Sequence, residues 1–140
     1  PETGFRESYR IKGETLITVQ DYTSGKLFDD AVSYAFYPVD LHTKTGVRPK
    51  PLKRGIVPSI PLGALIPKGS RNLIVAGRCV SSDRLANSGL RVQASCMGMG
   101  QAAAAAATLA VQGNTTPSEV PLEQIHGLLK KHGAIVPGKA

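Results

Sequence analysis

Hydrophobic positions along the chain form short runs, and one of these runs leads into a long segment of small residues. Residues 73–76 (LIVA) are continuously apolar and stop at Gly77, a pattern that predicts a short buried strand. After a polar loop, residues 91–112 include six consecutive alanines. Alanine is the strongest helix former, so this segment predicts a helix that ends at Gly113. Because small residues lie on every side of it, we expect this helix to be buried among its neighbours.

The rest of the pattern predicts short elements separated by turns. The expected order is a strand at residues 13–20, a turn at 21–25, a short helix at 26–36, a proline-broken basic loop at 37–54, short extended pieces at 55–72, a polar loop at 78–89, a linker at 114–120, a second helix at 121–132 closed by Gly133, and a short extended segment at 134–140. The prolines at 58, 61 and 67 exclude a helix and a central strand there. The fold class is therefore α+β, with antiparallel strands in the first half.

Composition and charge narrow the classes of function. The chain has 140 residues, enough for one domain, with 41% apolar residues, no tryptophan and a net charge of +7. No acidic residue lies between Asp40 and Asp83, and this basic stretch suits nucleic acid, an anionic membrane or a phosphate-bearing cofactor. A solvated basic loop at residues 44–54 is the simpler alternative. We expect no nucleic-acid binding, since no module or interleaved aromatics are present, and no membrane span, since residues 94–111 are mostly alanine with polar interruptions.

The two cysteines give no metal-binding signal. Cys79 and Cys96 are seventeen residues apart and form neither a CxxC pair nor a zinc-ligand set, so we expect two buried free thiols and no metal.

Glycines near the start of the alanine-rich helix raise a question of function. Gly98 and Gly100 each weaken a helix by about 1 kcal/mol relative to alanine. Because these positions accept that cost, we expect them to leave space for a flat or bulky group close to the helix backbone. A helix N-terminus has unpaired N–H groups and a partial positive charge that suit a phosphate or a developing anion. Strand, glycine, loop and helix start together favour a cofactor site, and ordinary close packing of an alanine helix on a sheet is the alternative.

Several stretches of the chain carry a specific resemblance to a known family. They are RESYRIKG (residues 6–13), FDDAV (28–32), YPVDLH (37–42), IPLGALIPKGSRNLIVAGR (60–78) and the strand–loop–helix segment at 72–110. In this order they resemble motifs of the FAD-dependent oxidoreductase family, including its strand ending in AGR and its S-x-R-V-x-x-x-C-M-x-x-G-Q-A-A-G-x-A-A segment. The resemblance covers nearly the whole chain. Ala104 stands where the family often has glycine, and Gln93 where it often has methionine.

One element of that family is missing from the sequence. No GxGxxG loop for the ADP half of FAD is present, and GMGQAA at residues 98–103 does not directly follow a strand. The resemblance therefore implies the C-terminal part of a larger flavoprotein, completed by a missing N-terminal FAD-binding portion or a partner subunit. We expect the isolated chain to bind FAD weakly or not at all and to be inactive, and an exposed apolar face to favour a partner or a homo-oligomer.

The resemblance also implies how the chain is divided. Residues 1–71 would form the substrate-side portion, residues 72–113 a strand–loop–helix unit that returns to the dinucleotide-binding sheet, and residues 114–140 a linker and a C-terminal helix. A non-catalytic folded fragment that needs the partner carrying the ADP-binding unit is the alternative. The substrate would be a small molecule that transfers a hydride to the flavin, and its identity stays open.

The residues that the resemblance assigns to the site fall into two groups. The cofactor-binding group is Gly77, Arg78, Arg91, Val92, Ser95, Gly98 and Gln101. The catalytic group is His42, Arg6 and Glu7, with His42 as a general acid or base. For Arg91 and Arg78 a surface role, and for His42 a structural role, are the alternatives. His126 and His132 are expected to be surface residues.

Overall fold

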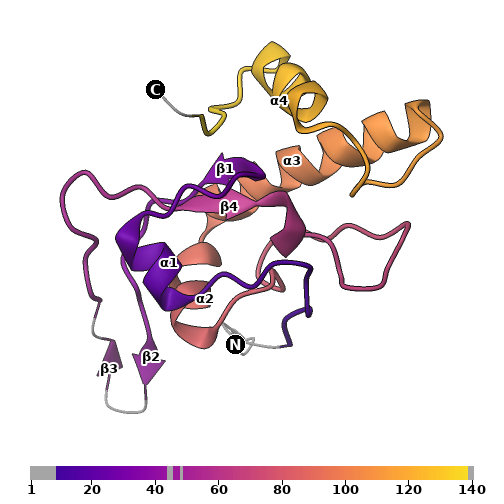
Figure 1. The fold of residues 1–140 in the computed structure, drawn as a ribbon. Coiled ribbons are helices and arrows are strands. Elements are labelled where there is room, and N and C mark those ends of the chain that lie inside the picture. Colours follow the sequence, from indigo (N-terminus) through magenta and orange to yellow (C-terminus); the bar gives the residue numbers. More distant parts are fainter. Residues whose placement is uncertain (1–8, 44–45, 48, 139–140) are drawn as a thin grey trace, which may run out of the picture.

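The computed structural model describes residues 9–43, 46–47 and 49–138, and in this part of the chain it combines helices with short strands (Figure 1). The elements in chain order are α1 (Val19–Ser24), β1 (Ala31–Tyr34), β2 (His42–Thr43), β3 (Gly46–Val47), β4 (Ser59–Pro61), the 3₁₀ helix η1 (Leu62–Ala64), α2 (Arg84–Leu90), α3 (Gln93–Gln112) and α4 (Leu122–Lys131). This mixture confirms the α+β class expected from the sequence.

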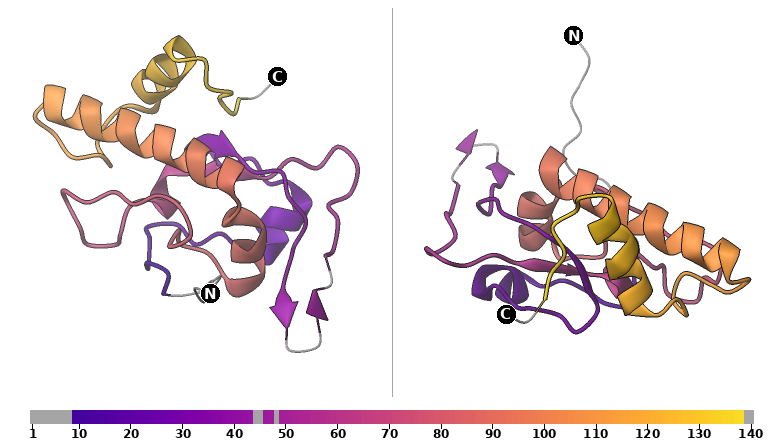
Figure 2. Two further views of the ribbon diagram at one scale, coloured as in Figure 1. Left: turned by 180° about the vertical axis from the view of Figure 1, so that it is seen from behind. Right: turned by 90° about the horizontal axis from the view of Figure 1, so that it is seen from above.

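The body of the molecule is built in layers around α3. Strands β1 and β4 pair antiparallel, α3 packs against β1, and α4 packs against α3 and reaches the start of β1 (Figures 1 and 2). Helix α1 contacts α2, which leads into the start of α3 (Figure 1). The β2–β3 hairpin, with His42 opposite Val47, projects away from this body. After α4 the chain runs back toward β1 (Figure 2).

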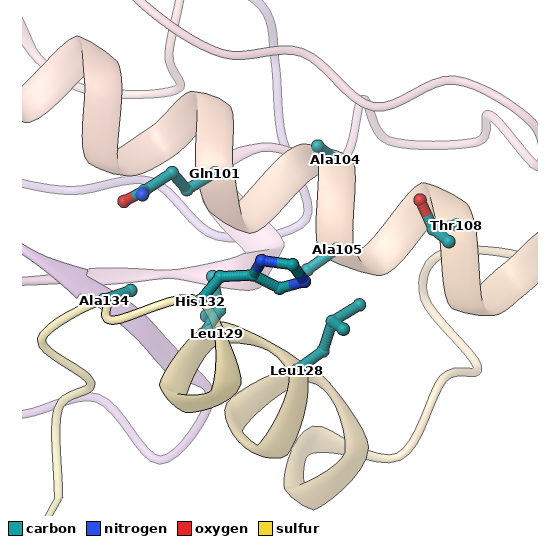
Figure 3. A pocket seen from close by; sticks show the side chains of 8 residues that line it. All are labelled: Gln101, Ala104, Ala105, Thr108, Leu128, Leu129, His132 and Ala134. Atoms are coloured by element: carbon teal, nitrogen blue, oxygen red, sulfur yellow. The ribbon is translucent and has the colours of Figure 1, made fainter.

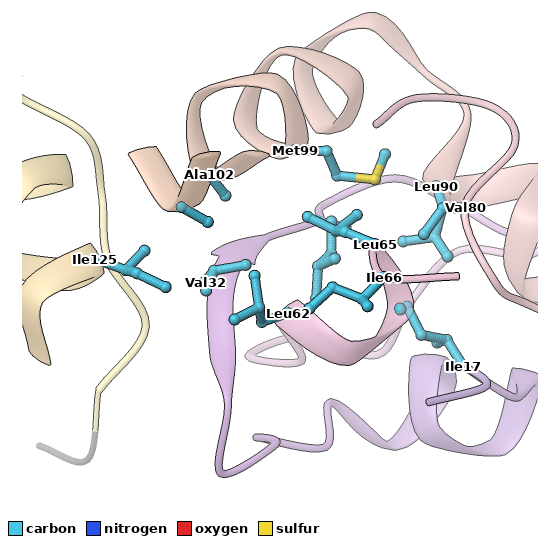
Figure 4. Close-up of a cluster of buried hydrophobic side chains, with 14 of the residues drawn as sticks. Ile17, Val32, Leu62, Leu65, Ile66, Val80, Leu90, Met99, Ala102 and Ile125 are labelled. Carbon is cyan, nitrogen blue, oxygen red and sulfur yellow. The ribbon is translucent and has the colours of Figure 1, made fainter. Parts of the chain in front are cut away.

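The core lies between α3, the β1–β4 pair and the segments that flank them (Figure 4). Its fully buried side chains are aliphatic apart from Tyr22, and the largest are Ile17, Ile60, Leu65, Leu90, Met99 and Ile125. Burying one such side chain contributes about 1.5–3 kcal/mol to stability. Alanines of α3 fill the remaining space, which is why the helix approaches its neighbours closely.

Helix α1 begins at Val19, so it takes the last two residues of the strand expected at 13–20 and most of the turn expected at 21–25, while residues 13–18 make only isolated bridges at Gly13 and Ile17. Thr18 and Asp21 form a reciprocal cap: Thr18 Oγ1 accepts from the Asp21 amide at 3.1 Å, and Asp21 Oδ2 accepts from the Thr18 amide at 3.1 Å. Gly25, at φ 72°, ends the helix. This capping signal outweighs the strand preference of the β-branched residues, so the strand prediction was wrong for α1, while Ile17 still makes an isolated bridge to Ser82.

The short helix expected at residues 26–36 was also wrong, because these residues include strand β1. Tyr34 and Ser33 pair with Ser59 and Ile60 of β4. At the start of the strand, Asp30 fixes the turn into η1, since its carboxylate accepts from the Gly63 amide at 2.8 Å. The apolar spacing fits a helix equally well, and it is the distant partner strand that decides the conformation.

The loop expected at residues 78–89 contains a further helix, α2. Its N-cap is Asp83, whose Oδ1 accepts from the Ala86 amide at 2.8 Å. The second oxygen of the same carboxylate, Oδ2, accepts from the amide of Val19 at 2.6 Å, so Asp83 satisfies the starts of both α1 and α2.

The strand expected at residues 73–76 is absent as a paired element. The segment has no strand assignment in the described chain, although the Val75 amide donates to Leu65 O at 2.8 Å. Leu73 is 52% exposed. A strand needs hydrogen-bonded neighbours, and this segment has the apolar sequence without them. Residues 134–138 likewise form no assigned strand.

The two long helices match the sequence prediction. Helix α3 begins at Gln93 rather than residue 91 and ends at the expected Gly113, and α4 is closed by Gly133 at φ 75°. By length and composition α3 could cross a membrane. One face of it, which includes Met99 and Ala106, is buried against β1 and α4, but Ala94, Ala104 and Val111 are exposed, so the expected burial on every side was wrong.

Candidate functional site

The start of α3 is open rather than closed by a side chain. Its N-cap, Val92, is extended (φ −74°, ψ 156°) and makes no side-chain cap. The first amide paired within the helix is that of Cys96, which donates to Val92 O at 3.0 Å. The preceding amides of the first turn have no intrahelical acceptor, and both Gln93 and Ala94 are exposed. This end can therefore donate hydrogen bonds to an approaching anion.

Gly77 lies beside this helix start. Its φ of 94° is in the left-handed region, and a Cβ at this position would stand 3.9 Å from the Cys96 sulfur. The following turn is held to α2, because the buried Asn87 donates from Nδ2 to Arg78 O at 3.0 Å and to Ser82 Oγ at 3.2 Å. The fold thus brings Gly77, Arg78 and the start of α3 together.

Asn87 is a residue of this site that the sequence analysis missed. It is 2% exposed and organises the turn that follows Gly77. A polar side chain in a segment interpreted as a loop gives no sign that it will be buried, so only the capping residue Asp83, which starts α2, could have pointed to it.

The pKa of Cys96 reflects its partly buried position beside Arg78 and Cys79 at the start of α3. Burial raises the pKa of the Cys96 thiol, the positive charge of Arg78 acts in the opposite direction, and Cys79 raises it further. Cys96 is therefore a neutral thiol at physiological pH. Both cysteines are free, as expected, but each is only partly buried.

Arg91 connects the α2–α3 junction to the segment that carries His42. Its Nη2 donates to Asp40 O at 3.1 Å. The Asp40 amide donates to Ser88 Oγ at 3.0 Å, and Asp40 Oδ2 lies 3.4 Å from His42 Nε2. Two residues predicted for different parts of the site, Arg91 and His42, thus converge on Asp40.

Two polar atoms in this cluster are buried without a hydrogen-bond partner among the described residues, Asp40 Oδ1 and Arg91 Nε. Asp40 Oδ1 is an acceptor and Arg91 Nε is a donor, so each lacks a polar partner of the opposite kind. A buried polar atom of this kind is costly unless something pairs with it.

The other three predicted cofactor residues on α3, Ser95, Gly98 and Gln101, lie along its length. At Gly98 a Cβ would collide with Ser33 Oγ of β1, so this glycine permits the close approach of α3 to the sheet. Gln101 is exposed and lines two cavities. One, of 570 Å³, is bounded by Ser33, Ala94, Met97 and the segment after α4. Ser95 is 2% exposed and lies on the buried face of α3, apart from Gln101.

The second cavity that Gln101 lines has a volume of 290 Å³ and lies between α3 and α4 (Figure 3). Ala104, Ala105, Leu128 and Leu129 give it largely apolar walls, and the imidazole of His132 points toward α3 (Figure 3).

The histidines of α4 differ from each other. His132 is exposed, as expected. His126 is partly buried, and its Nε2 donates to Ala31 O at 2.8 Å, which corrects its expected surface assignment. The predicted catalytic residues Arg6 and Glu7 lie outside the described residues. Within the described part of the chain, no cluster of His, Cys, Asp and Glu could hold a metal ion.

Comparison with known proteins gives one result that agrees with this geometry. A family model described as FAD dependent oxidoreductase matches residues 1–129. Neither a curated protein nor a solved structure matches the chain. Because the family model covers most of the chain, the chain belongs to the FAD dependent oxidoreductase family.

Proposed function

We propose that this chain supplies the flavin-ring end of an FAD site and part of the substrate site of a flavin-dependent oxidoreductase. The observation that supports this most directly is the position of Gly77 beside the open N-terminus of α3. A residue without a side chain lets the flavin approach the backbone, and the helix start offers unpaired N–H donors.

The fit to FAD rests on charge as well as space. FAD, when bound, accepts a hydride from the substrate. A reduced flavin is negatively charged on the pyrimidine side of its ring, and the amides at the start of α3, with Arg78, would stabilise that charge. Arg91 would contribute its positive charge from the α2–α3 junction, while its Nη2 stays bonded to Asp40 O.

On the substrate side, we propose that His42 takes the proton released when the substrate transfers its hydride. Its side chain is 34% exposed and can therefore be reached. Arg6 and Glu7 stay a prediction for the same side, and Arg6 together with His42 would suit a small substrate with hydroxyl or carboxylate oxygens.

We also propose that the ADP half of FAD is bound by a glycine-rich unit outside this chain, in a longer polypeptide or a partner subunit. The segment at residues 73–76 supports this, since it has the apolar sequence of a sheet strand but no strand assignment in the described chain, and its Leu73 is 52% exposed. The second candidate function, a non-catalytic fragment that only completes a partner's fold, is favoured by the same segment and would leave His42 without a role.

Absorbance spectroscopy tests the proposal. The chain is purified alone and together with the glycine-rich unit, and the flavin absorption band is measured after removal of free FAD. We expect the band only in the combined protein, with bleaching by small α-hydroxy acids in the absence of oxygen. The non-catalytic alternative predicts that His42→Gln leaves bleaching unchanged. A combined protein that retains no flavin would refute the proposal.

A further inference from the structure

Asp40 has an unusual position beside His42. Its side chain is 13% exposed, whereas that of His42 is 34% exposed, and Asp40 Oδ2 lies 3.4 Å from His42 Nε2. The carboxylate is therefore mostly inside the protein, and the imidazole reaches from it toward solvent.

The backbone of Asp40 is held on both sides. Its amide donates to Ser88 Oγ at 3.0 Å, and Ser88 Oγ itself donates to Leu85 O at 2.6 Å. Its carbonyl accepts from Arg91 Nη2 at 3.1 Å.

The residue before Asp40 is fixed as well, since Val39 exchanges two backbone hydrogen bonds with Lys50, at 3.0 and 2.8 Å. The backbone of Asp40 is therefore fixed, and the burial of its side chain, which is 13% exposed, limits how far the carboxylate can follow a moving ring.

The support for His42 is weaker than the support for Asp40. His42 lies in the two-residue strand β2, which pairs with the two-residue strand β3, and this hairpin projects from the body (Figure 1). Among the described residues, its ring has one ion-pair partner, Asp40. Among these residues, that carboxylate is therefore the charged group that can orient the ring.

We infer that Asp40 is a positioning residue that holds the His42 imidazole by Nε2 and leaves Nδ1 as the nitrogen that takes the substrate proton. This inference rests on the proposed role of His42. A carboxylate beside one ring nitrogen fixes both the tautomer and the direction of the other nitrogen, which a base on a short projecting hairpin cannot do by itself. Asp40 acts through His42 and does not touch the substrate in this role.

The orientation can be measured without a substrate. Ring relaxation is recorded by NMR on the chain with ¹³C-labelled histidine, and His42→Gln identifies the His42 signal. In the unmodified chain we expect an order parameter of about 0.8 for the His42 ring, falling below about 0.6 in Asp40→Ala. His126, bonded to Ala31 O, is the internal control and should not change.

Asp40→Asn is the second variant, because it keeps the shape and an acceptor oxygen, and its ring order should lie between the two values. If Asp40→Ala also changes the ring order of His126, the ring order of His42 in the unmodified chain is compared with that in Asp40→Asn instead. A His42 ring that is equally ordered in the unmodified chain and in the decisive variant would overturn the inference.

Kinetics of the flavin-loaded protein separate this inference from the proposed function. With an α-hydroxy acid that bleaches the flavin, Asp40→Asn should lower kcat about tenfold with little change in KM, and should add less than about twofold in the His42→Gln background. If Asp40→Asn lowered kcat equally with and without His42, Asp40 would not act by positioning His42. If His42→Gln alone leaves kcat unchanged, the proposed base is wrong, and the ring measurement still decides what Asp40 does.

Discussion

Arg91 donates a hydrogen bond from Nη2 to the backbone carbonyl of Asp40 at 3.1 Å, across 51 positions of sequence. This bond joins the junction between α2 and α3 to the segment that precedes β2. Any shift of the helix start is therefore transmitted to the segment that positions His42, so the two predicted parts of the site are mechanically linked.

Replacing Arg91 by methionine should destabilise the protein. The change keeps the apolar stem and removes the donor, so the Asp40 carbonyl loses its partner in a partly buried position. We expect a loss of about 1–2 kcal/mol in the free energy of unfolding, measured by urea denaturation. Lys131→Met, at an exposed position of α4, is the control and should stay within about 0.5 kcal/mol. Equal effects of the two changes would show that the bond contributes nothing.

The two glycines of α3 should respond oppositely to alanine. At Gly98 a Cβ collides with Ser33 Oγ, and at Gly100 nothing lies within 4 Å. Gly98→Ala should therefore cost about 1–3 kcal/mol through overpacking, and Gly100→Ala should stabilise by up to about 1 kcal/mol through helix propensity. Thermal or urea unfolding measures both.

A second substitution shows whether the Gly98 effect comes from Ser33. Shortening Ser33 to alanine removes the colliding oxygen, so Ser33→Ala combined with Gly98→Ala should recover part of the loss. An alanine at Gly98 that is tolerated without loss would contradict the packing interpretation and favour room for a bound ring.

His126 should contribute to holding α4 against β1. Its Nε2 donates to Ala31 O at 2.8 Å, so His126→Ala removes one hydrogen bond between elements 95 positions apart. We expect a loss of about 1–2 kcal/mol by urea denaturation. His132→Ala is the matched control on the same helix. A similar loss for His132→Ala, at the C-cap residue of α4, would mean that the bond to Ala31 O does not explain the effect.

Glu119 should make stability depend on pH in the acid range. Hydrogen bonds from the Thr116 hydroxyl, the Thr115 hydroxyl and the Thr116 amide lower the pKa of Glu119 to about 2. Because the folded pKa is depressed, the stabilisation is present above the ordinary glutamate pKa of about 4.3 and is lost as the pH falls through about 2.

Urea midpoints measure this effect when the chain is compared with Glu119→Gln. The difference between the two proteins should be largest near neutral pH and should disappear as the pH approaches about 2. An NMR titration of the Glu119 carboxyl carbon gives the pKa directly. A midpoint near the ordinary glutamate value would contradict the expected cause.

The sequence was sufficient for the elements that local preference decides. The six alanines and the glycines at 113 and 133 fix α3 and α4 without reference to the rest of the chain. Residues 26–36 show the limit, because β1 exists through its pairing with β4, about thirty positions away, and no local pattern contains that partner.

The site could be predicted only in outline, for a related reason. The position of Gly77 before a helix start is visible in the order of residues, and the fold does bring them together. The contacts of Asp40 with Arg91, Ser88 and His42 depend on how distant segments pack, and so does the burial of Asn87. Such contacts require the three-dimensional arrangement, since nothing in the spacing of these residues specifies them.

The carboxylate of Asp83 closes the starts of α1 and α2, which lie 64 positions apart in the chain, and this has a consequence for local unfolding. If either helix frays from its first turn, the shared carboxylate loses part of its fixed geometry. The first turn of the other helix then becomes exposed to water. The amide protons of the two helices should therefore exchange with deuterium at a common rate, as a single cooperative unit of the fold.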